Sequence, residues 1–105
     1  MEAQANAAGD LVVISGALES ASAADVRVAL HDAVDRGTGD IVIDLRGVDH
    51  IDATGLGVLV GAYRRAQRGE RRLILRAVPP RIQRLLTVTR LHRVIPNEPA
   101  SPSHV

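Results

Sequence analysis

The sequence predicts an α/β domain with a small, mixed but largely parallel sheet and helices packed on it. Short apolar runs rich in Val and Ile alternate with longer segments whose apolar residues recur at helical spacing. The segments between the runs are long enough to return the chain to the same edge of a sheet, which parallel neighbours require. With 105 residues, the chain is expected to form one domain.

The first strand is predicted over residues 11–15 and closes at Gly16. A helix follows that begins at Ser20 or Ser22, because either hydroxyl fits an N-cap, and ends at Gly37. Its inner face is predicted from five apolar residues at helical spacing: Ala23, Val26, Leu30, Ala33 and Val34.

Residues 41–45 contain few polar side chains and predict a central strand buried on both faces, followed by a loop over residues 46–52. The next helix ends at Gly69. Its apolar stripe is predicted at i, i+3, i+4 and i+7: Leu56, Leu59, Val60 and Tyr63.

Residues 73–75 predict another buried strand, and Pro79-Pro80 stop it and start a third helix. The inner face of this helix is predicted to carry Ile82, Leu85, Leu86 and Thr89. Residues 94–95 are predicted as a last short strand. The folded domain is therefore expected to span residues 10–96, with flexible tails at 1–9 and 97–105.

Composition excludes several classes of function. Thirteen basic residues against twelve acidic ones leave no basic excess for general nucleic-acid binding, and one aromatic residue, Tyr63, provides no stacking platform. Without cysteine there is no disulfide and no thiolate metal site. No apolar run approaches the roughly 20 residues of a membrane span, and the first residues lack a signal-peptide pattern. The sequence predicts a cytoplasmic protein without direct membrane contact.

The most informative segment is 52–57, Asp-Ala-Thr-Gly-Leu-Gly, at the expected start of the second helix. A helix start leaves N–H groups unpaired and stabilises an anion such as a phosphate. The Thr54 hydroxyl is therefore a candidate for a removable phosphate, which predicts a phosphorylation switch. A helix cap is the alternative role of Thr54, and the two roles can coexist. Asp52 is predicted to cap the helix or to accept hydrogen bonds in the loop.

Other residues near this segment have two interpretations each. Gly55 and Gly57 either permit tight packing of the helix on the sheet or let a partner approach the backbone. Asp44 either ends its strand and bonds loop amides or lies near the phosphate site. The apolar centre of a docking surface is expected near Leu56 and Val58.

No catalytic role and no cofactor are expected. The three carboxylates of Glu19, Asp44 and Asp52 lie in separate segments and are weak evidence for a metal site. The chain has no phosphate-loop pattern and no recognisable nucleophile motif. The histidines have no zinc-ligand spacing: His31, His50, His92 and His104.

Two segments resemble the STAS domain, the fold of bacterial anti-sigma factor antagonists. Residues 43–45 followed by 51–59 are similar to the family signature, in which Asp-Ser-Ser/Thr-Gly-Leu-Gly carries the phosphorylated residue. Thr54 falls on that position. Residues 15–19 resemble the family's Gly-Glu-Leu-Asp turn, and the resemblance covers about residues 10–96.

The sequence departs from the family pattern at three positions, and the family's usual last helix is expected to be missing or to be part of the tail. Thr54 replaces the commoner serine, and its methyl group stiffens χ1. Glu19 stands where the family often has Asp. Arg90 replaces the glycine that is usual near the end of the third helix.

The resemblance implies partner switching. The unphosphorylated antagonist binds an anti-sigma factor that is also a serine/threonine kinase, and so frees a sigma factor for transcription. The kinase phosphorylates the switch hydroxyl, here Thr54, and a phosphatase removes the phosphate. The docking surface around Thr54 is expected to comprise Glu19, Asp44, Asp52, Gly55, Leu56 and Gly57.

The resemblance leaves a second function open, because small STAS proteins also serve as accessory subunits of ABC-type lipid transporter ATPases, where threonine can occupy the switch position. The arginines at the end of the second helix form either a solvated helix end or a patch for an acidic partner: Arg64, Arg65, Arg68, Arg71 and Arg72. The chain is expected to be a monomer or a weak dimer.

Overall fold

The computed structural model describes residues 2–98 and confirms the predicted α/β class. One sheet holds the strands in chain order: β1 (Glu2–Ala5), β2 (Leu11–Leu18), β3 (Ile41–Ile51), β4 (Leu73–Arg76) and β5 (Asn97–Glu98). β2 to β5 are parallel neighbours, whereas β1 pairs antiparallel with β2. The helical elements are α1 (Ala23–Arg36), α2 (Ala53–Arg68), α3 (Pro80–Val88) and the 3₁₀ turn η1 (Leu91–Arg93).

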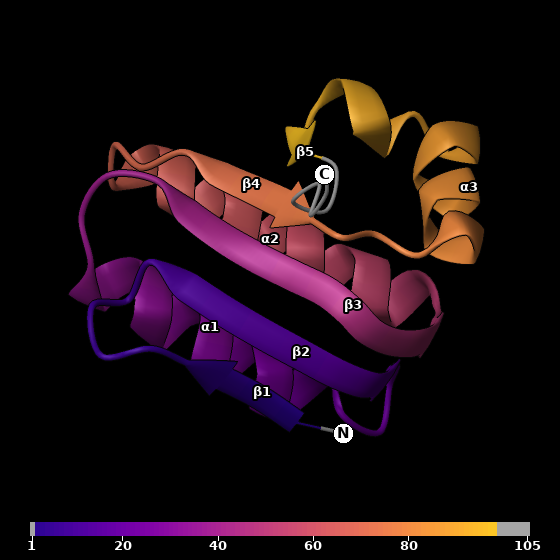
Figure 1. Cartoon of the computed structure of the whole chain (residues 1–105), viewed down its shortest axis with the longest axis horizontal. Helices are drawn as coiled ribbons and strands as arrows, with labels where there is room; N and C mark the ends of the chain where they lie inside the picture. Colours follow the sequence, from indigo (N-terminus) through magenta and orange to yellow (C-terminus); the bar gives the residue numbers. More distant parts are fainter. Residues whose placement is uncertain (1, 99–105) are drawn as a thin grey trace, which may run out of the picture.

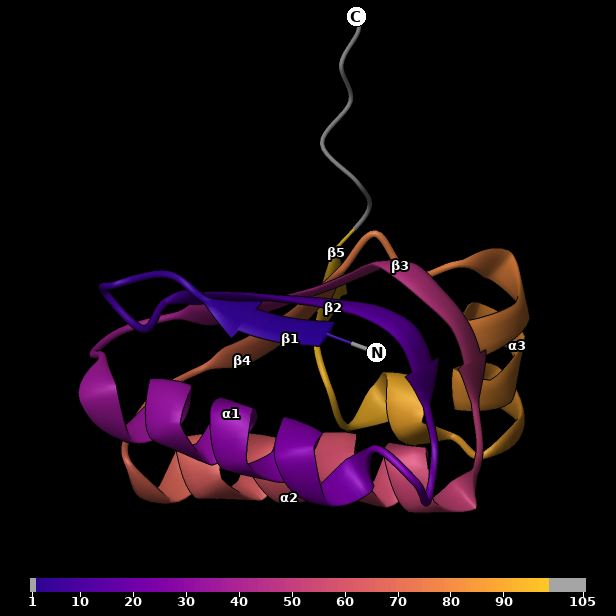
Figure 2. The same cartoon turned by 90° about the horizontal axis from the view of Figure 1, so that it is seen from below.

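Helices α1 and α2 lie side by side on one face of the sheet, α3 lies beyond the end of β3, and η1 connects α3 to β5 (Figures 1 and 2). The aliphatic core fills the space between this face and the two helices. Ile41, Ile43 and Leu45 point into it and are fully buried, while Val42 on the opposite face is only half-buried. The prediction of a strand buried on both faces therefore holds only in part for β3: both long helices pack on the same side, and on the other face Val42 is half-buried while Asp44 is buried.

The first described residues form an element that the sequence analysis did not expect. β1 pairs with β2 from Glu2 opposite Ser15 to Ala5 opposite Val12, and Ala3 and Ala5 pack against the core. Alanine has a weak preference for strands, so this short edge strand carries no clear signal in the sequence.

Strands β2 and β3 both run further than predicted. β2 continues through Gly16, whose φ of 89° falls in a region that glycine adopts without strain. The two strands pair as far as Leu18 opposite Ile51, with two irregularities in register at which the extra residue lies on β3. Residues 46–51 are therefore strand and not loop, and the paired ends deliver the chain directly to the start of α2.

The inner face of α1 matches the prediction, but that of α2 matches it only at Leu59. The buried residues of α2 are Gly55, Val58, Leu59, Ala62 and Ala66. Leu56, Val60 and Tyr63 flank the core instead of facing it. Three of these five residues are glycine or alanine and allow the helix to lie close to the sheet, so most of the large apolar residues of α2 do not mark its buried stripe. Val58 is 2% exposed and cannot form the centre of a docking surface.

The last elements also differ from the prediction. Residues 91–93 form η1, and the final strand is at 97–98, although Ile95 is still buried in the core. Thr89 is exposed. Arg90 has a φ of 62°, the left-handed conformation that favours glycine, which gives a physical reason for the glycine of the resembled pattern. The predicted tail lies outside the described residues from residue 99 onward.

Candidate functional site

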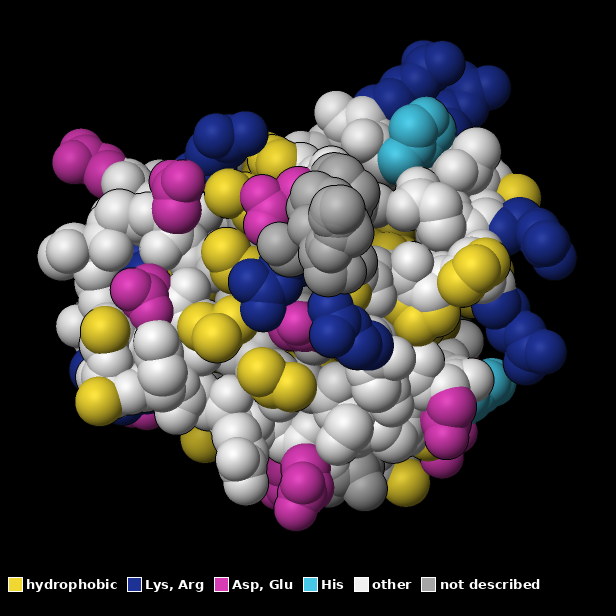
Figure 3. All heavy atoms as spheres, viewed as in Figure 1, with side chains coloured by type: hydrophobic (Ala, Val, Ile, Leu, Met, Phe, Trp, Pro, Cys, Tyr) yellow, Lys and Arg dark blue, Asp and Glu magenta, His cyan; other side chains and the backbone are white. Residues whose placement is uncertain are grey.

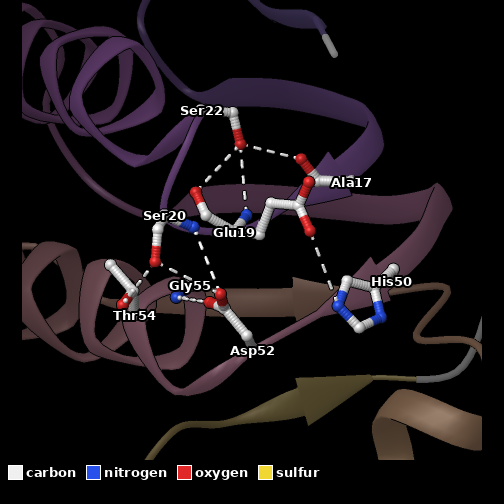
Figure 4. Close-up of polar contacts among 8 residues, drawn as sticks. All are labelled: Ala17, Glu19, Ser20, Ser22, His50, Asp52, Thr54 and Gly55. Atoms are coloured by element: carbon white, nitrogen blue, oxygen red, sulfur yellow. Dashed lines mark hydrogen bonds and ion pairs between the residues drawn. The ribbon is translucent and has the colours of Figure 1, made fainter.

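The carboxyl ends of β2 and β3 meet at the start of α2, and this junction is the candidate site (Figure 4). The Asp52 N–H donates to the Leu18 carbonyl at 3.3 Å, which fixes the entry to the helix against the end of β2. Ser20 on the turn after β2 then faces Asp52 and Thr54.

Asp52 is the N-cap of α2, which is one of the two roles predicted for it. Its carboxylate accepts the Gly55 N–H at 2.9 Å. It also accepts the N–H of Ser20 at 3.2 Å, so it joins the turn after β2 to the helix. The bond from the Gly55 N–H is the main reason that the pKa of the Asp52 carboxyl lies below its ordinary value.

Thr54 is the second residue of α2 and is exposed. Because Asp52 occupies the capping position, the cap interpretation of Thr54 is wrong. Its hydroxyl accepts a hydrogen bond from the Ser20 hydroxyl at 3.2 Å. The oxygen therefore stands at the protein surface, at the positive end of a helix dipole, with a second hydroxyl beside it.

Ser20 is the site residue that sequence reasoning assigned differently. It was a candidate cap for α1, but the hydroxyl that organises that turn belongs to Ser22, which donates to the Ala17 carbonyl at 2.8 Å and accepts the Glu19 N–H at 3.1 Å. Ser20 lies 34 positions before Thr54 in the chain, and no local spacing rule connects them.

The two glycines of the segment have different surroundings. A Cβ on Gly55 would lie 2.2 Å from the Leu18 carbonyl oxygen and 2.8 Å from the Ile51 side chain, so this position requires glycine for packing. A Cβ on Gly57 would meet nothing within 4 Å. Packing therefore accounts for Gly55, while Gly57 leaves open space on the exposed surface of the helix, three residues after Thr54.

Glu19 lies at the edge of the site. Its carboxylate is 3.6 Å from Nε2 of His50, and both side chains are substantially exposed. The structure thus brings Glu19, Asp52, Gly55, Leu56 and Gly57 to the neighbourhood of Thr54, with Leu56 half-buried.

Asp44 is not part of this site. It lies seven residues before Ile51 on β3, about 20 Å along the strand. Its carboxylate accepts the Arg46 N–H at 2.9 Å and pairs with the Arg76 guanidinium at 2.9 Å. Burial alone would raise the pKa of Asp44, but these bonds outweigh it and hold the pKa below its ordinary value.

Within residues 2–98, no three side chains of the metal-binding types lie close enough to hold an ion. No helix in this range has the length and apolar character needed to cross a bilayer.

The arginines in the last turns of α2 and just after it do not form a uniform patch. Arg65 pairs with Asp35 of α1 at 2.6 Å. Arg71 is 5% exposed and donates to backbone carbonyls, so it belongs to the interior. Arg64, Arg68 and Arg72 are exposed, which leaves a smaller surface cluster than the sequence suggested.

Asp52→Ala is expected to lower the Tm by a few degrees, because it removes the cap and the bond to Ser20. Asp52→Asn keeps an acceptor for the Gly55 N–H and should lose clearly less. Since the pKa of Asp52 is lowered in the folded protein, its contribution is complete above the ordinary value of 3.8 and disappears as the pH falls through the folded-state pKa. Thermal unfolding of the three proteins from neutral to acid pH tests this, and a constant difference at all pH values would contradict it.

Comparisons with known proteins decide the family of this fold and site. The family model described as "Mlab, STAS domain" matches residues 1–96. The chain belongs to the STAS domain family. Among curated STAS relatives, the anti-sigma-B factor antagonist of Staphylococcus aureus is 31% identical over 80 residues, which cover 76% of this chain and 74% of that protein.

Solved STAS structures share the fold. A putative anti-sigma factor antagonist from Thermotoga maritima superposes with a TM-score of 0.78 at 21% identity, covering 97% of this chain and 87% of that one. The phosphorylated form of SpoIIAA, a cell fate determinant of Bacillus, gives a TM-score of 0.71 at 18% identity, covering 95% and 90%.

Proposed function

We propose that this STAS protein is an anti-sigma factor antagonist that binds an anti-sigma factor with serine/threonine kinase activity and is switched off by phosphorylation of Thr54. The observation that carries the proposal is the exposed Thr54 hydroxyl at the start of α2. The names of the curated relatives and the solved phosphorylated SpoIIAA support it. The chain acts in the cytoplasm as a binding protein and kinase substrate, and a phosphatase resets it.

The electrostatics of the site favour a switch that needs no refolding. A phosphate adds about −1.5 to −2 charges at pH 7. On Thr54 it would join the carboxylate of Asp52, which is bonded to the same Ser20, and lie near Glu19. Asp52 already occupies the Gly55 N–H, so the phosphate would compete for that donor. Crowding of negative charge on a docking surface repels a complementary partner, and a tenfold loss of affinity takes only about 1.4 kcal/mol.

The surface next to Thr54 suits close approach of a protein. Gly57 presents bare backbone one turn further along α2, and Leu56 contributes half-buried apolar area beside it. A kinase that must reach the Thr54 oxygen can therefore lie flat on this part of the helix.

Thr54→Ala is expected to fold with a free energy of unfolding within about 0.5 kcal/mol of wild type, because Thr54 is exposed and is not the cap. It should bind the kinase constitutively, whereas Thr54→Glu should bind at least about tenfold more weakly. The measurement is a pull-down from the source organism, identification of the captured kinase by mass spectrometry, and titration of that kinase with each purified variant. Thr38→Glu, an exposed change at the opposite end of β3, is the matched control.

The switch would be contradicted by a folded Thr54→Ala protein that no longer binds, or by equal binding of Thr54→Glu and wild type. A kinase assay adds a direct readout, because phosphate should appear on wild type and not on Thr54→Ala.

An accessory subunit of an ABC-type lipid transporter ATPase is the second candidate. Threonine in place of serine at position 54 favours it. The matching family model is also described as "Mlab, STAS domain" and not as an anti-sigma factor antagonist, which is the name of the curated relatives. The same pull-down separates the two, since it would capture a transporter ATPase instead of a kinase.

A further inference from the structure

An apolar groove of about 420 Å³ lies between α3 and the end of β3. Ile51 and Ile82 line it and are almost fully buried. Leu85 and Val88 on α3 complete its apolar lining, and Val88 is 74% exposed, although it is a large aliphatic side chain. The groove is large enough for a few aliphatic side chains and lies at the surface.

The rim of this groove is basic. Arg81 and Arg84 line it from α3, both are exposed, and no ion pair engages either of them within residues 2–98. Residues 77–97 contain no acidic side chain at all, while Arg90 and Arg93 add further positive charge. Over α3, apolar side chains lie among dark-blue ones on the molecular surface (Figure 3).

The groove is continuous with the candidate switch site. His50 lines the groove on one side and lies 3.6 Å from Glu19 on the other. Ile51 in the groove immediately precedes Asp52, the cap of the switch helix. A protein that covers Thr54 is therefore within reach of the groove.

We propose that this groove binds an acidic amphipathic helix of the protein partner, with aliphatic side chains in the groove and carboxylates on Arg81 and Arg84. The two arginines are three residues apart on α3 and so lie on one face about 5–6 Å apart. Carboxylates one turn apart on a partner helix have the same spacing, and Arg is suited to bidentate carboxylate binding. The identity of the partner rests on the proposed function. The binding of an acidic helix in the groove is argued from the groove's own side chains and does not depend on that function.

A defined peptide tests the groove without any knowledge of the partner. The probe is a synthetic amphipathic helix with leucines on one stripe and glutamates beside it, titrated into the full chain while methyl signals are followed by NMR. We expect shifts confined to the groove, and binding that weakens at high salt and falls about tenfold or more in Arg81→Glu/Arg84→Glu. Arg64→Glu/Arg68→Glu makes the same charge change at the far end of α2 and should bind like wild type.

Four results would overturn the proposal: no shift in the groove, shifts elsewhere, equal binding of a peptide with lysine in place of glutamate, or retention by phosphatidylglycerol vesicles in the absence of peptide binding. The kinase captured with wild type gives a second readout. Full binding of that kinase to Arg81→Glu/Arg84→Glu, together with loss on Thr54→Glu, would overturn the groove and leave the switch intact. Peptide binding in the groove without capture of any kinase would contradict the switch alone.

Discussion

Gly55→Ala is expected to lower the free energy of unfolding by about 3 kcal/mol. The new Cβ would stand 2.2 Å from the Leu18 carbonyl oxygen, far inside contact distance. That oxygen cannot move away freely, because it also accepts the Asp52 N–H and the Leu18 side chain is fully buried. The strain must be relieved by moving α2 off the end of β2.

Gly57→Ala is the matched control for this prediction. It makes the same change on the same helix, but its Cβ would meet nothing within 4 Å. Replacement of a glycine inside a helix should then stabilise the protein by about 0.5–1 kcal/mol. Urea unfolding of the two variants therefore gives shifts of opposite sign, and two shifts of similar size and the same sign would refute the packing argument.

Arg71→Met is expected to reduce the free energy of unfolding by about 3 kcal/mol, because it removes the N–H donors of the guanidinium and leaves backbone carbonyl groups buried without a hydrogen bond. The guanidinium donates to Gly9 at 2.8 Å, to Ala33 at 2.9 Å and to Gly39 at 2.9 Å. These carbonyls belong to the turn before β2, the last turn of α1 and the loop before β3. One side chain thus binds three segments and satisfies carbonyls at the negative end of a helix dipole.

Arg72→Met controls for the loss of charge, since Arg72 is the next residue and is exposed. It should change the free energy of unfolding by no more than about 0.5 kcal/mol. Arg71→Lys keeps the charge but has a single ammonium in place of the planar guanidinium, and it should recover less than half of the loss. Equal stability of Arg71→Met and Arg72→Met would show that the hydrogen bonds of the Arg71 guanidinium make no net contribution to the free energy of unfolding.

The parts of the fold that the sequence predicts well are those in which large side chains mark the buried face. All five residues predicted for the inner face of α1 are buried. On α2 the same reasoning finds only Leu59, since Gly55, Ala62 and Ala66 make up most of the side that touches the sheet. A prediction that looks for large apolar residues does not recognise a helix face that packs on the sheet through glycine and alanine.

The candidate site was predictable where its geometry is local. The cap formed by Asp52 follows from its place three residues before Gly55. The absence of Asp44 from the site depends on the length of β3, and the contact of Ser20 with Thr54 depends on how two strand ends meet. The burial of Arg71 likewise arises from three segments distant in the chain, which no short window of sequence contains.

The strand order of the sheet is the order of the chain, from β1 to β5. As the protein is synthesised, each strand that emerges finds its neighbour already present, and no early strand must wait for a later one to be inserted beside it. The antiparallel pair β1–β2 needs only the turn between residues 5 and 11 to close, a short loop with a low entropic cost. Growth of the sheet can therefore proceed in one direction, from the N-terminal edge, and the pairing of β1, β2 and β3 needs no part of the chain that follows β3.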